Sequence, residues 1–217
     1  MNATRLLKSI GAVAAVAFLC GCSTVHPRYL AQPEPLAVRG TYVHPPSGIV
    51  MPESVAGFRR DMVLRYDTDS FDVSAGYNFL SAIQPIVATV YIYPAPSLVS
   101  IGSPPEVVAD ARAHLTEREF ERRKQEIEHV HPGCVFIEQR DIMQIENGQS
   151  YPGKLAVFEY EGTFAGSRIS LRSRLYVFCF VGGKWAIEYR FTCPKHADTD
   201  EKIQEFIQKW RWFGTGI

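Results

Sequence analysis

The stretch Arg172-Ser-Arg-Leu-Tyr-Val-Phe-Cys-Phe-Val-Gly-Gly-Lys-Trp-Ala-Ile-Glu-Tyr-Arg-Phe-Thr192 decides the fold, because it encodes two long strands joined by a tight turn. Gly182-Gly183 is a two-residue hairpin signal, since glycine reaches the positive φ angles that such turns need. An aromatic stripe on one side of such a hairpin is far more typical of a core than of a ligand platform. With this turn, the facing pairs of that stripe are Tyr176 and Tyr189, Phe178 and Ile187, and Phe180 and Trp185.

Runs of β-branched and aromatic residues predict further strands before this hairpin. The clearest run, residues 86–93, ends at a proline and is typical of a central strand. Two more candidates follow the turn residues Pro132-Gly133. In chain order, the expected strands are residues 63–66, 73–78, 86–93, 134–143, 154–161, 172–181 and 184–192.

A long helical segment is expected between the third and fourth of these strands. Ser103-Pro104-Pro105-Glu106 marks its start, with serine as cap and proline at the first helical position. Thr116 and Glu119 have the spacing of a second capping box, so we predict a kink or a new helix beginning at Thr116. The apolar positions agree with that break, since two sets lie about 120° apart round the helical axis. These sets are Val108, Ala111 and Leu115, and Phe120 with Ile127.

The C-terminal segment predicts a second helix. Asp198 and Glu201 stand in capping-box spacing at its start. Apolar residues then recur at i, i+3, i+4 and i+7, which is typical of an amphipathic helix laid on a sheet. These residues are Ile203, Phe206, Ile207 and Trp210.

This order of elements predicts an α+β fold, with an antiparallel β-sheet packed between helices in an α/β/α sandwich. In that order the chain resembles the PsbP photosystem accessory proteins and related bacterial lipoproteins. The resemblance covers residues 50–213 as a pattern of elements, without a shared motif. It implies an accessory or binding protein rather than an enzyme, although fold alone does not fix function.

The N-terminus has the layout of a secretory signal. Arg5 and Lys8 are its only charged residues, and an apolar run over residues 10–20 follows. That run of about 11 residues is short of the roughly 20 that a membrane-spanning helix needs, so a permanent transmembrane anchor is the weaker interpretation.

Leu19-Cys20-Gly21-Cys22 resembles the lipobox of bacterial lipoprotein precursors, which implies cleavage before Cys22 and lipid on that cysteine. Cys20 stands where the family usually has a small or β-branched residue. Cys20 is itself a poorer acceptor, because Phe18 and Leu19 would then occupy positions where the peptidase prefers small residues. Several acyl chains on one cysteine give stable membrane anchoring. In a Gram-negative host, Ser23 resembles the outer-membrane sorting signal, which would place the domain in the periplasm.

These features divide the chain into a signal peptide (1–21), a lipidated tether (22–48) and a single α+β domain (49–217). Five prolines and few apolar residues favour the tether, which at about 3.1 Å per residue could extend roughly 80 Å. The alternative is that part of this segment packs on the domain, with Tyr42 and Val43 the best candidates for contacts.

The charge balance gives no signature of nucleic-acid binding. Loss of Arg5 and Lys8 with the signal peptide leaves 21 of the 23 basic residues against 23 acidic ones, a net charge near −2. A nucleic-acid-binding surface needs a clearly basic balance.

Three cysteines remain in the folded part: Cys134, Cys179 and Cys193. The hairpin register places Cys193 opposite Arg172, about 23 Å along the strand from Cys179 at roughly 3.3 Å per residue. A disulfide needs Cα atoms within about 7 Å, so these two cannot pair. Cys134 with Cys193 is the better candidate bridge, because both stand at strand ends, and Cys179 is expected to be a buried free thiol.

Few residues carry recognisable chemistry. His129, His131 and Cys134 could together ligate zinc or copper, but the histidines are better explained as residues ending a helix. Asp72-Val-Ser-Ala-Gly76 lacks the first glycine of a nucleophile elbow. The strand carboxylates Glu159, Glu161 and Glu188 are interpreted as ordinary solvated or rim positions. We therefore expect neither a metal nor another cofactor.

The leading hypothesis is a non-enzymatic, membrane-anchored lipoprotein of the cell envelope, of binding or assembly-accessory type, that acts through contacts with a protein partner. The alternative is a lipoprotein that binds a small apolar ligand or a metal. An enzyme of unrecognised type is a third hypothesis, which a deep polar cleft with converging ionisable groups would support.

Overall fold

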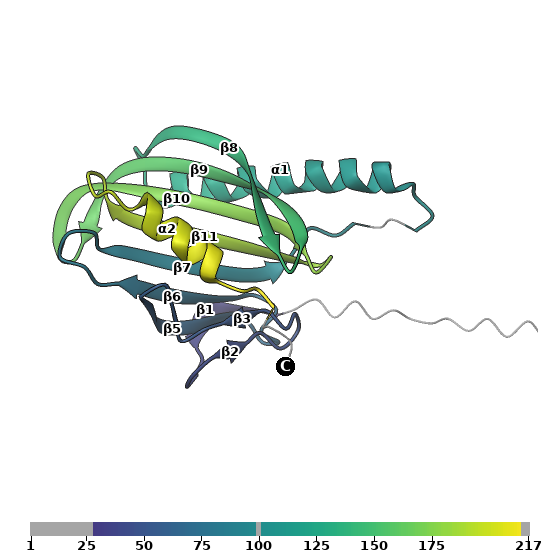
Figure 1. The fold of residues 1–217 in the computed structure, drawn as a ribbon, viewed down its shortest axis with the longest axis horizontal. Helices are drawn as coiled ribbons and strands as arrows, with labels where there is room; N and C mark the ends of the chain where they lie inside the picture. The colour runs from purple at the N-terminus through teal and green to yellow at the C-terminus, as the bar shows by residue number, and fades with distance from the viewer. Residues whose placement is uncertain (1–27, 99–100, 214–217) are drawn as a thin grey trace, which may run out of the picture.

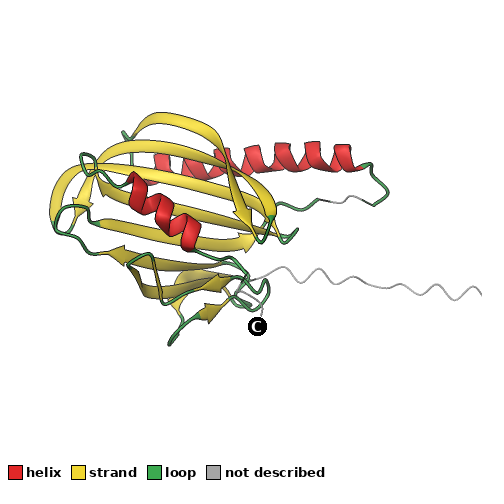
Figure 2. Ribbon diagram, viewed as in Figure 1, coloured by secondary structure: helices red, strands yellow, loops and turns green. Residues whose placement is uncertain are grey.

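The computed structural model describes residues 28–98 and 101–213, and Figures 1 and 2 show a large antiparallel sheet with one helix on each side of it. The helices are α1 (Pro105–Val130) and α2 (Asp200–Lys209). The strands are β1 (Tyr29–Pro35), β2 (Tyr42–Val43), β3 (Val50–Met51), β4 (Ser54–Val55), β5 (Phe58–Asp67), β6 (Val73–Phe79), β7 (Ile86–Pro94), β8 (Val135–Glu146), β9 (Gln149–Phe164), β10 (Ser167–Val181) and β11 (Trp185–Pro194).

The main sheet has nine strands in the order β1-β5-β6-β7-β11-β10-β9-β8, with β4 paired to β5. Strands make up 51% of the structure and helices 20%, so the fold is mostly β. The predicted α/β/α sandwich of PsbP type is therefore wrong. Its physical error was to assign a complete helical layer to each face, whereas α2 has only ten residues and α1 buries only three.

All seven predicted strands exist, and the decisive hairpin has most of its expected register. Tyr176 pairs with Tyr189 and Phe178 with Ile187. The ladder then shifts, so that Val181 rather than Phe180 lies opposite Trp185. Phe180 sits in this bulge at φ 61° and packs against the cluster on the α1 side, so its predicted place in the core stripe is wrong.

Helix α2 fills the centre of the main core, as its apolar spacing predicts. Ile203, Phe206, Ile207 and Trp210 are all buried. The Phe206 ring lies edge-on to rings from β5, β6 and β11, whose centroids are 4.7 to 6.2 Å away. Strands far apart in the sheet therefore meet on one helix face, and the sheet curves around α2 (Figure 1).

Helix α1 is one continuous helix, so the predicted new helix at Thr116 is wrong. Its three buried residues, Glu119, Phe120 and Ile127, all lie in the C-terminal half, and its N-terminal end extends past the ends of the strands (Figure 1). The first apolar set, Val108, Ala111 and Leu115, is only partly buried. Both sets can therefore belong to one continuous helix. No helix in residues 28–98 and 101–213 is long and apolar enough to cross a bilayer.

The tether prediction is wrong for residues 29–48. Strand β1 pairs with β5, and β2 pairs with β3, so the alternative of packing on the domain holds here. His44 is fully buried between these segments, with Nε2 2.7 Å from the Ser70 carbonyl. The signal peptide (1–21), Cys22 and the first residues of the tether lie outside the described residues.

Candidate functional site

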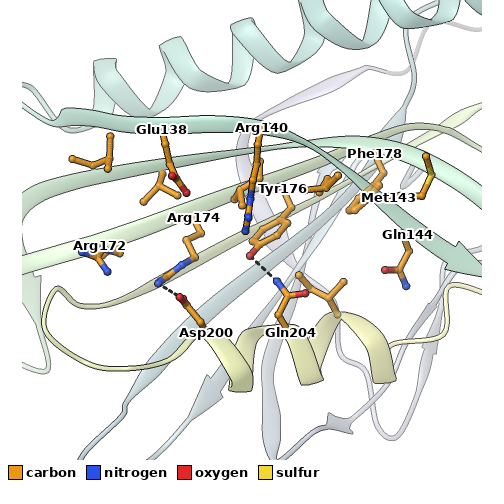
Figure 3. Close-up of a pocket in the computed structure, with 15 residues that line it drawn as sticks. Glu138, Arg140, Met143, Gln144, Arg172, Arg174, Tyr176, Phe178, Asp200 and Gln204 are labelled. Carbon is orange, nitrogen blue, oxygen red and sulfur yellow. Dashed lines mark hydrogen bonds and ion pairs between the residues drawn. The ribbon is translucent and has the colours of Figure 1, made fainter.

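A groove of about 520 Å³ lies between β8 and α2, above the surface of β9 and β10 (Figure 3). Glu138 and Arg140 reach into it from β8, and Asp200 and Gln204 reach into it from the opposite side on α2. Apolar side chains line much of its inner surface. These include Ile142, Leu155, Val157, Phe178 and Ile207. The groove therefore combines charged and amide groups at its mouth with an inner surface that is partly apolar.

Alternation along β10 places three polar side chains on the floor of the groove. Arg172, Arg174 and Tyr176 occupy every second position of the strand, so they project from the same face. In a sheet whose inward positions are otherwise apolar, two adjacent inward arginines are costly unless each is paired.

Both of these arginines are paired. The Arg172 guanidinium contacts Glu159 Oε1 at 2.8 and 3.1 Å, and Lys195 contacts the other oxygen of Glu159 at 2.6 Å. Arg174 is buried and forms an ion pair with Asp200. Its Nη1 also lies 3.5 Å from the Thr199 hydroxyl.

Arg140 differs from these two. It projects from β8 toward Tyr176 in Figure 3, and it forms no ion pair or hydrogen bond within the part of the chain that the structure describes. It is close enough to influence the titration of Tyr176, whose pKa burial raises to about 12 while the charge of Arg174 lowers it. Gln204 donates a 3.3 Å hydrogen bond to the Tyr176 hydroxyl. At neutral pH, Tyr176 is therefore a protonated group suited to hydrogen bonding.

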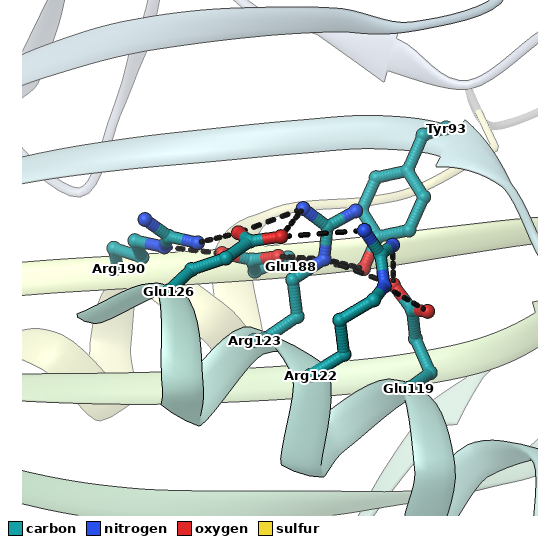
Figure 4. Close-up of polar contacts among 7 residues, drawn as sticks. All are labelled: Tyr93, Glu119, Arg122, Arg123, Glu126, Glu188 and Arg190. Carbon is teal, nitrogen blue, oxygen red and sulfur yellow. Dashed lines mark hydrogen bonds and ion pairs between the residues drawn. The ribbon is translucent and has the colours of Figure 1, made fainter. Parts of the chain in front are cut away.

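The opposite face of the sheet carries a buried ion-pair network under α1 (Figure 4). Glu188 of β11 is fully buried and contacts Arg123 at 3.2 Å and Arg190 at closer range. Arg123 also lies over the Tyr93 ring, 4.0 Å from its centroid. Glu119, Arg122 and Glu126 extend the network along α1. Two ion pairs, Arg123 with Glu188 and Glu126 with Arg190, thus link α1 to the sheet. The interpretation of Glu188 as a solvated or rim residue is wrong.

The network favours the charged forms of Glu119 and Arg123. Burial alone would raise the pKa of Glu119, but the hydrogen bond from Arg122 and the charge of Arg123 outweigh it and lower that pKa. Burial alone would lower the pKa of Arg123, whereas Tyr93, Glu188 and Glu119 raise it. Nearby Asp72 is different, because burial raises its pKa to about 6. The compensated charges of the network fit a structural clamp for α1 rather than acid–base chemistry.

The structure does not assemble the metal-binding candidates. His129 is exposed in the last turn of α1, and His131 stacks on Tyr160 with ring centroids 3.9 Å apart. Burial and the charge of Arg190 lower the pKa of His131. Across the two described ranges, no group of three or more histidine, cysteine or acidic side chains is placed to hold a metal. The hypothesis of a site at His129, His131 and Cys134 therefore has no geometric support.

The candidate disulfide between Cys134 and Cys193 is also wrong, since both are free thiols. Cys193 belongs to the core around α2, while Cys134 packs against the cluster under α1, so the sheet itself separates them. Cys179 is a buried free thiol, as predicted. Burial raises its pKa to about 12, so it is a poor nucleophile at neutral pH.

The other catalytic candidates are placed as structural residues. Asp72 directly precedes β6 and Val73 to Gly76 lie within it, so this segment does not form a strand-to-helix turn; the Ser74 hydroxyl lies 3.0 Å from that of Tyr66. Glu159 pairs with Arg172 and Lys195, and Glu161 contacts the Ser170 hydroxyl. None of these groups combines with another into a nucleophile and base.

Sequence reasoning missed the groove. Tyr176 is predicted only as a core residue, and Arg140, Arg172 and Arg174 are not predicted as site residues, although the spacing of the last two with Tyr176 on one predicted strand is visible. Polar residues at inward positions of a strand indicate either a paired cluster or a binding surface. The position of α2 over them, which creates the groove, was not available from that spacing.

No family model matches this chain, and no curated protein has a significantly similar sequence.

Proposed function

We propose that the protein is a lipid-anchored, non-enzymatic binding protein of the cell envelope, and that its folded domain binds a small, partly apolar ligand in the groove between β8 and α2. The groove itself carries this proposal. Its volume of about 520 Å³ falls within the range of small-molecule sites, which combine apolar walls with a few placed polar groups.

The chemistry of the groove supports binding over catalysis. Most of its polar groups donate hydrogen bonds at neutral pH: three arginines, two amides and a tyrosine whose pKa burial raises to about 12. Of its two carboxylates, Asp200 is held in an ion pair with Arg174, and Glu138 has, among the described residues, no second ionisable group beside it in a nucleophile-and-base arrangement. The anchor rests on the lipobox, with Cys22 as the lipidated residue.

The anchor is tested by replacing the acceptor, Cys22→Ala, in full-length protein expressed in a bacterial host. We expect the denatured wild-type mass to equal residues 22–217 plus acyl chains, and the variant to lack these chains, because the acceptor thiol is gone and Cys20 is a poor substitute for it. Cys20→Ala is the matched control and should be processed like wild type. A wild-type mass that still includes residues 1–21 would contradict the proposal.

The ligand is tested by filling the groove from α2. In native mass spectra of protein extracted in detergent, we expect wild type to carry an additional small-molecule mass that Gln204→Trp loses, because the larger ring would occupy the groove. Gln208→Trp is the matched control, since Gln208 is exposed on the same helix and does not line the groove. An additional mass retained by Gln204→Trp would place the ligand elsewhere, and absence of any such mass in wild type would count against small-ligand binding.

Contact with a protein partner, the leading hypothesis from the sequence, is the second candidate. One observation favours it: five large apolar side chains on β8 are between 43% and 63% exposed. An apolar surface of this kind marks a binding surface more often than scattered single residues do.

A further inference from the structure

The two edges of the main sheet differ in how well they are protected against pairing with another strand. Both edge strands have a register shift against their neighbour, β1 against β5 and β8 against β9, but only β1 also holds prolines, Pro33 and Pro35. Proline has no backbone N–H to donate, so it prevents an added strand from completing a ladder. The other edge, β8, has no proline over its twelve residues.

Strand β8 is an open edge. Within the described residues it pairs only with β9, so the outward N–H and C=O groups of its backbone have no strand partner. Its exposed apolar side chains are Val135, Phe136, Ile137, Met143 and Ile145. These apolar side chains flank a polar centre, Glu138 to Asp141. A long edge strand with exposed apolar side chains and unpaired backbone groups is a template for adding a strand from another chain.

The charges on β8 indicate which strand would fit. Glu138 and Arg140 project from the same face, since they are two residues apart, and both line the groove (Figure 3). Neither forms an ion pair or a hydrogen bond with any residue in 28–98 or 101–213. Each therefore lacks a partner of opposite charge in the monomer.

An antiparallel copy of β8 supplies both missing partners. With a two-fold axis at Gln139, Glu138 of one copy lies opposite Arg140 of the other, and the reverse pair forms on the other side of the axis. Side chains directly opposite in such a ladder have Cβ atoms about 5 Å apart, within reach for an ion pair. An axis at Arg140 would instead bring two arginines together, and an axis at Asp141 two aspartates. The charges thus select one register.

We propose that β8 forms the interface between two copies of this chain, paired antiparallel about Gln139, so that the two sheets become continuous. This interface is independent of the ligand in the groove, but it uses the strand that forms one wall of the groove. Pairing would cover the unpaired edge and hold that wall in place.

The register is tested by disulfide trapping in full-length, detergent-extracted protein carrying Cys134→Ser, which removes the partly exposed native thiol. Residues directly opposite on antiparallel strands have Cα atoms about 5 Å apart, within the range for a disulfide. We expect Gln139→Cys to give a disulfide-linked dimer on mild oxidation. Asp141→Cys is the matched control on the same strand face, and its two copies would lie roughly 13 Å apart at about 3.3 Å per residue. Efficient linking through position 141 but not 139 would overturn the register.

The charges are tested by reversal. In sedimentation measurements over a range of micromolar concentrations, we expect wild type to dimerise and Glu138→Arg or Arg140→Glu to weaken dimerisation by more than about tenfold, equivalent to about 1.4 kcal/mol. The double variant restores both ion pairs with their signs exchanged, so its dissociation constant should return close to that of wild type. A monomeric wild type, or a double variant as weak as the single ones, would overturn the proposal.

Discussion

Replacement of Glu188 by glutamine is expected to lower the free energy of unfolding by about 3 kcal/mol, because loss of one partner leaves buried cations without their compensating charge. The Glu188 side chain is fully buried, and its carboxylate contacts Arg123, Arg190 and the Tyr93 hydroxyl. Glutamine keeps the volume but not the charge. Urea denaturation followed by tryptophan fluorescence measures the loss.

Glu126→Gln is the matched control. Glu126 also pairs with Arg123 and Arg190, but its side chain is 37% exposed, so water replaces much of the lost interaction. A partly exposed pair of this kind contributes about 1 kcal/mol or less. Equal losses in the two variants would show that burial does not decide the strength of this network, and that α1 is held mainly by Phe120 and Ile127.

Phe206→Ala is expected to lower the free energy of unfolding by about 3–5 kcal/mol, the usual cost of removing a buried aromatic ring. The ring lies among those of Phe58, Tyr77, Tyr189 and Phe191, so its loss leaves a cavity where three strands and α2 meet. These rings belong to a continuous core and cannot all move inward to fill the space. The same denaturation measurement detects the change.

Phe136→Ala serves as the control for ring size alone. Phe136 lies on β8 and is 43% exposed, so its truncation should cost about 1 kcal/mol through lost apolar burial. A loss at Phe206 as small as the loss at Phe136 would mean that the sheet does not depend on α2 for its curvature.

Local patterns predicted the strongest elements well. The hairpin from β10 to β11 follows from its aromatic alternation and paired glycines, and α2 follows from four apolar residues at helical spacing. Both signals arise from burial against the sheet, so sequence and structure agree where one face of an element is buried. The bulge at Phe180 broke the alternation at the turn, because a third loop residue, Lys184, joins the two glycines.

The N-terminal strands could not be predicted in the same way. Strand β1 is an edge strand with two prolines and mostly exposed side chains. Because neither of its faces is buried, its sequence does not alternate between apolar and polar residues. Its pairing with β5 is a long-range backbone contact that propensity does not reveal. The new helix expected at Thr116 failed for a related reason: no residue in the first half of α1 is buried, so its apolar spacing there does not mark a buried face.

By itself, the sequence determined the strands and helices that bury an apolar face, together with the charge balance and the lipobox on which the proposed anchor rests. Only the tertiary structure decided that the proline-rich segment joins the sheet, that Cys134 and Cys193 lie on opposite faces, and that α2 and β8 enclose a groove with Arg140 at its mouth. The physical reason is the sequence separation of the residues that interact. Periodicity reports which face of an element is buried, whereas a groove, an ion-pair network or an open edge depends on which distant elements become neighbours.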